Sequence, residues 1–96
     1  MNCWRWKMNS IVAFQGRGWE DYLYWQSHDK KTLKKVNQLI QDIDRNGYIG
    51  IGKPEALSNN LAGFWSRRID DNNRLVYRIR DNKIEIVQCK GHYDDK

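Results

Sequence analysis

Apolar residues follow a helical spacing in the first half of the chain and strand patterns in the second half, and this order limits the possible folds. Apolar residues recur at helical spacing over residues 18–29 and again over 30–47, whereas residues 63–93 carry strand signals separated by Asp/Asn turns. A short apolar run at residues 10–14 precedes the helices and also predicts a strand. The predicted order is β-α-α-β-β-β, an α+β domain whose two helices pack on one face of a small, twisted, mainly antiparallel sheet.

The second predicted helix has signals at both ends. Asp29 can cap its first turn, and Gly47 stands where a left-handed residue commonly ends a helix. Four lysines between residues 30 and 35 lie in its first turns, where they oppose the helix dipole. They indicate either a functional basic face or an ordinary solvated one. Residues 48–57, rich in Gly and Pro, predict a loop.

Length and charge narrow the class of protein. A chain of 96 residues suits one compact domain, which we place at residues 10–93, after an extension at 1–9 and before a short tail at 94–96. The net charge of +5 favours polyanionic partners such as nucleic acid, an anionic membrane or an acidic protein segment, but charge alone leaves an ordinary soluble basic domain equally open. The first ten residues contain no long apolar run, so we expect neither a signal peptide nor a membrane span there. We therefore expect a cytoplasmic protein.

Cysteine and histidine are too few for a metal or disulfide framework. Cys3 and Cys89 stand far apart, and the only histidines are His28 and His92. This set predicts neither a disulfide scaffold nor a zinc site. We therefore expect metal-free chemistry and no cofactor.

Alternation gathers arginines on one face of the predicted sheet. In RLVYRIR, residues 74–80, one face carries Arg74, Arg78 and Arg80 together with a valine, and the other is apolar. Arg68 joins this face only if the turn after Asp70 has an odd number of residues, and the sequence allows either parity. Such a face suits a phosphodiester chain, because arginine forks match phosphate oxygens.

Aromatic residues beside these arginines have two interpretations. Rings on a nucleic-acid-binding sheet can stack on bases, but sheet aromatics more often belong to the core. We expect a structural role for Trp65 and leave Phe64 open.

The same region offers groups for acid–base chemistry. A metal-free ribonuclease needs a base for the 2′-hydroxyl, cations for the phosphorane and an acid for the leaving 5′-oxygen. Glu55, the pair Arg68 and Arg74, and His92 could fill these roles. Taken alone the pattern is weak, since any small basic domain contains such residues.

Several motifs add a family resemblance. The segments WEDYLYWQ, DKKTLKKVNQLIQDI, GIGKPEAL, GFWSRRID, RLVYRI and C.GHY resemble, in order and spacing, the YoeB/Txe toxins of the RelE superfamily. The resemblance extends from Phe14 to Tyr93. It implies a bacterial toxin that enters the 30S A site of the ribosome, beside 16S rRNA, and cleaves the mRNA there. It also implies inhibition by a YefM-like antitoxin and a homodimer.

The resemblance assigns roles residue by residue. Glu55 resembles the general base of the family and His92 its general acid, while Arg68 and Arg74 resemble the phosphate-binding and transition-state arginines. Tyr93 matches the tyrosine that helps to position the substrate. We also assign RNA or phosphate binding to three further basic residues, Lys53, Arg67 and Arg78.

Departures from the family pattern leave alternatives open. Ser58 stands where relatives often have lysine, and residues 94–96 extend beyond the usual last tyrosine, so an attenuated relative that only binds RNA or antitoxin is one alternative. Another is a ParE-type inhibitor of DNA gyrase, against which Glu55 and the terminal His-Tyr pair argue.

The last strand raises a geometric question. Strict alternation from Ile84 and Ile86 would place His92 on their face of the sheet. If those isoleucines are core and the histidine is catalytic, a bulge or strand end near Lys90 and Gly91 must intervene.

Overall fold

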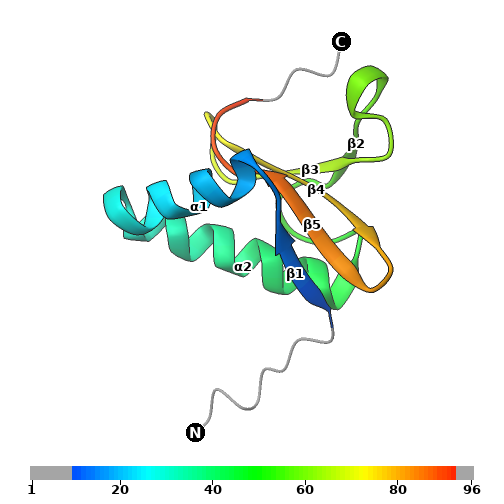
Figure 1. Cartoon of the computed structure of the whole chain (residues 1–96), viewed down its shortest axis with the longest axis horizontal. Helices are drawn as coiled ribbons and strands as arrows, with labels where there is room; N and C mark the ends of the chain where they lie inside the picture. Colours follow the sequence, from blue (N-terminus) through cyan, green and yellow to red (C-terminus); the bar gives the residue numbers. More distant parts are fainter. Residues whose placement is uncertain (1–9, 93–96) are drawn as a thin grey trace, which may run out of the picture.

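The computed structural model describes residues 10–92, and two helices pack against a five-stranded sheet (Figure 1). The elements are β1 (Ile11–Phe14), α1 (Arg17–His28), α2 (Lys30–Asn46), β2 (Glu55–Ala56), the short 3-10 helix η2 (Asn59–Leu61), β3 (Trp65–Arg68), β4 (Arg74–Arg80) and β5 (Lys83–Gln88). The strand order is β1-β5-β4-β3-β2. Only β1 pairs in parallel, with β5, so the sheet is mainly antiparallel and the predicted fold class is confirmed.

The limits of α2 agree with its predicted signals. The Asp29 carboxylate accepts hydrogen bonds from the backbone N–H (3.1 Å) and hydroxyl (2.8 Å) of Thr32, and these bonds lower the pKa of Asp29. Gly47 ends the helix with a φ of 71°, a conformation that glycine adopts without steric cost. One element differs from the expectation. The loop at residues 48–57 contains β2, which pairs with β3 through its backbone and has no apolar pattern that sequence could reveal.

The core lies between the helices and one face of the sheet. Both helices lie on the same side of the sheet, as Figure 1 shows. The apolar stripe of α2 packs with the inward-facing residues of β4 and β5; these residues are Val36, Leu39, Ile40, Ile43, Leu75, Tyr77, Ile84 and Ile86. Trp65 also packs against this cluster, as expected, and its ring stacks on Tyr48. The opposite face of the sheet therefore carries the alternating arginines.

A bulge interrupts β5 before its end. Ile86 pairs with Tyr77, but Gln88 pairs with Val76, so Val87 is an extra residue on β5. This irregularity shifts the alternation by one residue.

The strand then ends, which resolves the geometric question raised by the sequence. Ile84 is fully buried, and Cys89, just beyond the strand, is also fully buried. The chain turns at Gly91, whose φ is 81°, and His92 is exposed. The expected break is confirmed, and it begins at the bulge, upstream of residues 90–91.

No helix within residues 10–92 is long and apolar enough to cross a membrane. The predicted extension at 1–9, the tail at 94–96 and Tyr93 lie outside the described residues.

Candidate active site

A polar pocket lies where β2, β3 and β4 adjoin. Its volume is about 300 Å³, and its lining consists of Lys53, Pro54, Glu55, Ser66, Arg68 and Arg74. Three of these side chains are cations and one is a carboxylate. The fold thus brings together four of the residues that the sequence singled out, from segments up to twenty-one positions apart.

Strand register explains why the two arginines meet. Arg68 and Arg74 are direct partners across the β3–β4 pair, because the turn at residues 69–73 has an odd number of residues. The Nη1 atom of Arg74 donates to the carbonyl oxygens of Asp70 (2.6 Å) and Asn73 (3.1 Å). The guanidinium of Arg74 is therefore anchored on this turn, while Arg68 is exposed.

The loop before β2 brings Lys53 and Glu55 to the same pocket. The backbone N–H of Arg68 donates to the carbonyl of Gly52 at 2.6 Å, which joins the loop to β3. Lys53 adopts a left-handed backbone with a φ of 51°, which is uncommon for a residue other than glycine. A conformation of this kind persists only where the surroundings enforce it. The loop is thus held in a defined shape at the pocket.

Arg67 provides much of that enforcement and differs from the expectation that it binds phosphate. Its side chain is fully buried on the core face of β3, opposite in direction to Arg68. Its guanidinium donates to three loop carbonyls at 2.8–3.0 Å, pairs with a carboxylate of α2 and bonds a tyrosine hydroxyl at 3.2 Å; the partners are Gly47, Ile49, Ile51, Asp42 and Tyr77. Arg67 has no access to RNA. It supports the loop that carries Lys53 and Glu55.

Asp42 completes this support. Burial by itself would raise the pKa of Asp42, but hydrogen bonds from Arg67, the Ile51 backbone and Asn46 outweigh burial and lower it. The carboxylate is therefore ionised at neutral pH and balances the buried arginine.

Arg78 shares a sheet face with Arg74, as predicted, but it lies outside the residues that line the pocket. Its Nε donates to Glu85 at 2.6 Å, and its guanidinium lies 4.7 Å from the ring centre of Phe64. The hydrogen bond from Arg78 is the main cause of a lowered pKa at Glu85. Arg78 is thus paired within the protein, and Phe64 packs against an arginine.

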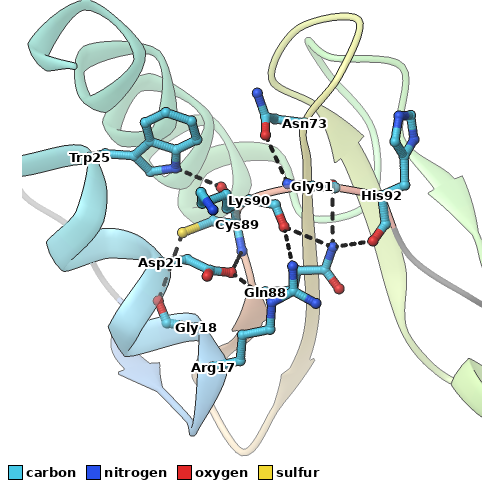
Figure 2. A network of polar contacts seen from close by, with 10 residues as sticks. All are labelled: Arg17, Gly18, Asp21, Trp25, Asn73, Gln88, Cys89, Lys90, Gly91 and His92. Carbon is cyan, nitrogen blue, oxygen red and sulfur yellow. Dashed lines mark hydrogen bonds and ion pairs between the residues drawn. The ribbon is translucent and has the colours of Figure 1, made fainter. Parts of the chain in front are cut away.

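The backbone next to His92 is hydrogen-bonded to the first residue of β4. The carbonyl of Gly91 accepts a hydrogen bond from the N–H of Arg74 at 3.0 Å, so the histidine directly follows the residue that pairs with the start of β4. Figure 2 shows the His92 ring pointing away from the polar network that holds this segment. The backbone before His92 is therefore joined to the start of β4, while His92 itself lies outside the residues that line the pocket, and its catalytic role stays a prediction.

The described residues offer the site neither a reactive thiol nor a cluster of metal ligands. Burial, followed by the charge of Asp21, raises the pKa of the Cys89 thiol to about 12, so this thiol stays protonated and unreactive. Within residues 10–92, no three or more His, Cys, Asp or Glu side chains gather in a way that could hold a metal ion.

Sequence reasoning missed several polar residues around the site. Ser66 lines the pocket because it shares a face with Arg68, two positions away, and strand alternation could have revealed it. Gln88 and Asn73 contact the segment before His92. An amide that follows the apolar residues at 84, 86 and 87 of β5 was a usable signal for Gln88, whereas Asn73 resembled an ordinary turn residue.

Comparison with known proteins agrees with this fold and identifies the family. The model of the family described as YoeB-like toxin of bacterial type II toxin-antitoxin systems matches residues 14–93. The chain belongs to this family. It is 53% identical to toxin YoeB of Escherichia coli K12 over 82 residues, which are 85% of this chain and 98% of that protein.

Solved structures give the same result. The YoeB–YefM complex from Staphylococcus aureus contains a chain that superposes with a TM-score of 0.82 at 50% identity, covering 88% of this chain and 98% of that one. A structure described as the YoeB dimer from Staphylococcus aureus has a TM-score of 0.83 at 51% identity, covering 88% and 99%.

Proposed function

We propose that this toxin is a ribosome-dependent endoribonuclease that cleaves mRNA in the A site by acid–base catalysis. The observation that carries the proposal is the pocket in which Glu55 faces a space shared with Lys53 and with the paired arginines Arg68 and Arg74. A carboxylate among several cations is the combination that transfer of a phosphodiester to its own 2′-oxygen requires.

The proposed reaction assigns each group one step. Glu55 removes the proton of the 2′-hydroxyl, and the 2′-oxygen forms a bond to phosphorus. His92 donates a proton to the 5′-oxygen as the bond between that oxygen and phosphorus breaks. The products are a 2′,3′-cyclic phosphate and a 5′-hydroxyl end, and no metal ion takes part in the scheme. Tyr93 is proposed to position the substrate beside His92.

The arginines stabilise the charge that develops between these proton transfers. Arg68 and Arg74 are cross-strand partners, so their guanidinium groups approach one phosphate from adjacent strands. Planar guanidinium forks can donate two hydrogen bonds each to phosphate oxygens. Arg74 is already anchored on its turn, which lowers the cost of orienting it during the reaction. Lys53 adds a further positive charge at the pocket.

The proposed partners follow from the same surface and from the relatives. A YefM-like antitoxin is proposed to cover Arg68 and Arg74 with an acidic or mixed segment that folds on binding, because occupation of the pocket excludes RNA. The Glu85 carboxylate already holds Arg78, so we place the centre of this contact at the pocket. A homodimer is proposed on the basis of the dimeric relative. A cytoplasmic location is proposed because the proposed substrate lies on the ribosome.

A reconstituted translation assay tests this function. Purified ribosomes carrying a defined mRNA are incubated with the toxin, and the RNA ends are mapped and analysed chemically. We expect cleavage at the A-site codon, a 2′,3′-cyclic phosphate end, no cleavage of free mRNA, and inhibition by the cognate antitoxin. A gyrase supercoiling assay runs in parallel. Intact mRNA together with blocked supercoiling would overturn the proposal in favour of a ParE-type activity.

A further inference from the structure

One buried side chain, that of Gln88, contacts every residue of the segment at 90–92. Gln88 is 8% exposed, and its Nε2 atom lies within hydrogen-bonding distance of three successive carbonyl oxygens, those of Lys90 (3.2 Å), Gly91 (3.2 Å) and His92 (2.8 Å) (Figure 2). A single amide thus gathers the backbone of residues 90–92 around itself.

Asn73 joins this segment to the turn that anchors Arg74. The Oδ1 atom of Asn73 accepts from the N–H of Gly91 at 2.8 Å, and its Nδ2 atom donates to the carboxylate of Asp70 at 3.0 and 3.1 Å. The turn also accepts from the Arg74 guanidinium, and the Gly91 carbonyl accepts from the Arg74 backbone. The guanidinium of Arg74 and the backbone before His92 therefore share one support.

Helix α1 fixes the other side of the segment. The Trp25 indole donates to the carbonyl of Cys89 (2.8 Å), the N–H of Cys89 donates to Asp21 (3.0 Å), and Arg17 donates to the carbonyl of Lys90 (2.6 Å). Figure 2 shows these three side chains reaching the segment from α1. The start of the segment is consequently attached to the core.

Converging carbonyls determine where the side chains go. Because the oxygen atoms of residues 90–92 point towards Gln88, the side chains of Lys90 and His92 must diverge from it. The Lys90 ammonium lies 4.4 Å from the ring centre of Tyr24 on α1, and the His92 ring points away from the network. The left-handed Gly91 between them permits this arrangement. The direction in which the His92 side chain leaves the chain is thus set by its backbone.

We infer that Gln88 and Asn73 are positioning residues for the reaction: they hold the backbone of His92 at a fixed place relative to Arg74. The inference rests on the proposed function, in which His92 delivers a proton to the 5′-oxygen of a phosphate held by Arg74. A displacement of about 1 Å in such a constellation can lower the rate about 100-fold without a matching loss of substrate binding. Loss of either amide should therefore lower kcat much more than it raises KM.

The principal test uses Gln88→Met, which keeps the length of the side chain and removes the N–H donors. We expect kcat for ribosomal mRNA cleavage to fall roughly 10- to 100-fold, with KM for programmed ribosomes changed less than about threefold. Asn73→Ala, at a less buried site, should show the same pattern and serves as a second variant if Gln88→Met does not fold.

A core variant separates positioning from stability. Ile43 is buried in α2, and its apolar side chain makes none of the hydrogen bonds that hold the segment, so Ile43→Val lowers stability and leaves those bonds in place. Thermal unfolding is measured for all variants, and Ile43→Val should keep the wild-type kcat. An equal loss of kcat in Ile43→Val and Gln88→Met would overturn the inference, since it would show that stability alone governs the rate.

Nuclear magnetic resonance tests the geometry independently of catalysis. The chain has two histidines, so the Cε1–Hε1 signal of His92 can be compared with that of His28, whose ring stacks on Tyr24. We expect Gln88→Met to shift or broaden the His92 signal and leave the His28 signal in place. An unmoved His92 signal, or a moved signal with wild-type kcat, would overturn the inference. If the wild-type chain cleaves no mRNA, the proposed function fails, and the His92 signal alone decides whether Gln88 fixes the segment.

Discussion

The ion pair beneath the pocket offers a prediction whose size follows from the structure. Asp42→Asn keeps the shape of the carboxylate but removes its charge, so the fully buried Arg67 loses its only anionic partner among the described residues. Removing one member of a buried ion pair costs about 3–5 kcal/mol. Two features reduce this value: the Asp42 side chain is 17% exposed, and Arg67 retains three carbonyl acceptors. We therefore expect a loss of about 2.5 kcal/mol in the free energy of unfolding.

Urea unfolding followed by tryptophan fluorescence measures this loss. With an m value of about 1.2 kcal/mol/M for a domain of this size, the midpoint should fall by about 2 M. Asp71→Asn removes the same charge from an exposed turn and should change the free energy of unfolding by less than about 0.5 kcal/mol. If Asp42→Asn shifts the midpoint no more than Asp71→Asn does, neutral acceptors suffice for Arg67 and the reasoning is refuted.

The pH dependence of the same pair has a definite sign. The folded-state pKa of Asp42 is lowered from 3.8, so its contribution is complete above that value. It disappears as pH falls through the lower folded-state pKa, where the folded protein also takes up the proton. The difference in stability between wild type and Asp42→Asn should consequently be constant from pH 5 to 7 and narrow below about 3.8. A difference that stays constant down to pH 2 would show that the charge of Asp42 is not what stabilises Arg67.

Three further outcomes concern the pocket and the segment before His92. Glu55→Gln should lower cleavage roughly 10²- to 10⁴-fold with ribosome binding little changed, and full activity in a cleavage assay would remove Glu55 as the base. Arg74→Lys keeps the charge but not the planar fork, so cleavage should still be impaired in the same assay; wild-type rates would show that simple charge attraction is enough. Gly91→Ala places a Cβ 3.1 Å from the Arg17 guanidinium at a φ of 81°, and should lower the thermal midpoint by several degrees. An unchanged midpoint would show that the turn tolerates a side chain.

Local patterns were sufficient for the helices and for the face that carries the arginines. The Asp29 cap and the Gly47 end depend on a few adjacent residues, which is why the limits of α2 agree with the prediction. Alternation in β4 correctly separated Leu75 from Arg74. The meeting of Arg74 with Arg68 needed one further fact, the odd length of the turn, which the sequence left open.

The parts that sequence did not predict depend on partners far along the chain. Arg67 lies two positions from both Trp65 and Ile69 and so shares the core face with them. A buried arginine is nevertheless unfavourable unless its charge and its donors are satisfied. Apart from Tyr77, its partners stand 16–25 positions away in α2 and the following loop, where no local pattern identifies them. The contact between Asn73 and Gly91 spans 18 positions and is equally invisible to periodicity.

The adjacent arginines Arg67 and Arg68 therefore have different roles at this site, one structural and one facing the pocket, and the position of the helices determines which residue has which role. Alternation sends Arg67 and Arg68 to opposite faces of β3, and only the face covered by α2 supplies the carboxylate that makes burial tolerable. Once Arg67 is fixed, the carbonyls that it gathers shape the loop bearing Lys53 and Glu55, and Arg68 bonds that loop from its backbone while its side chain faces the pocket. The buried arginine thus determines the form of the pocket, and the exposed one is left to meet the phosphate that we propose it binds.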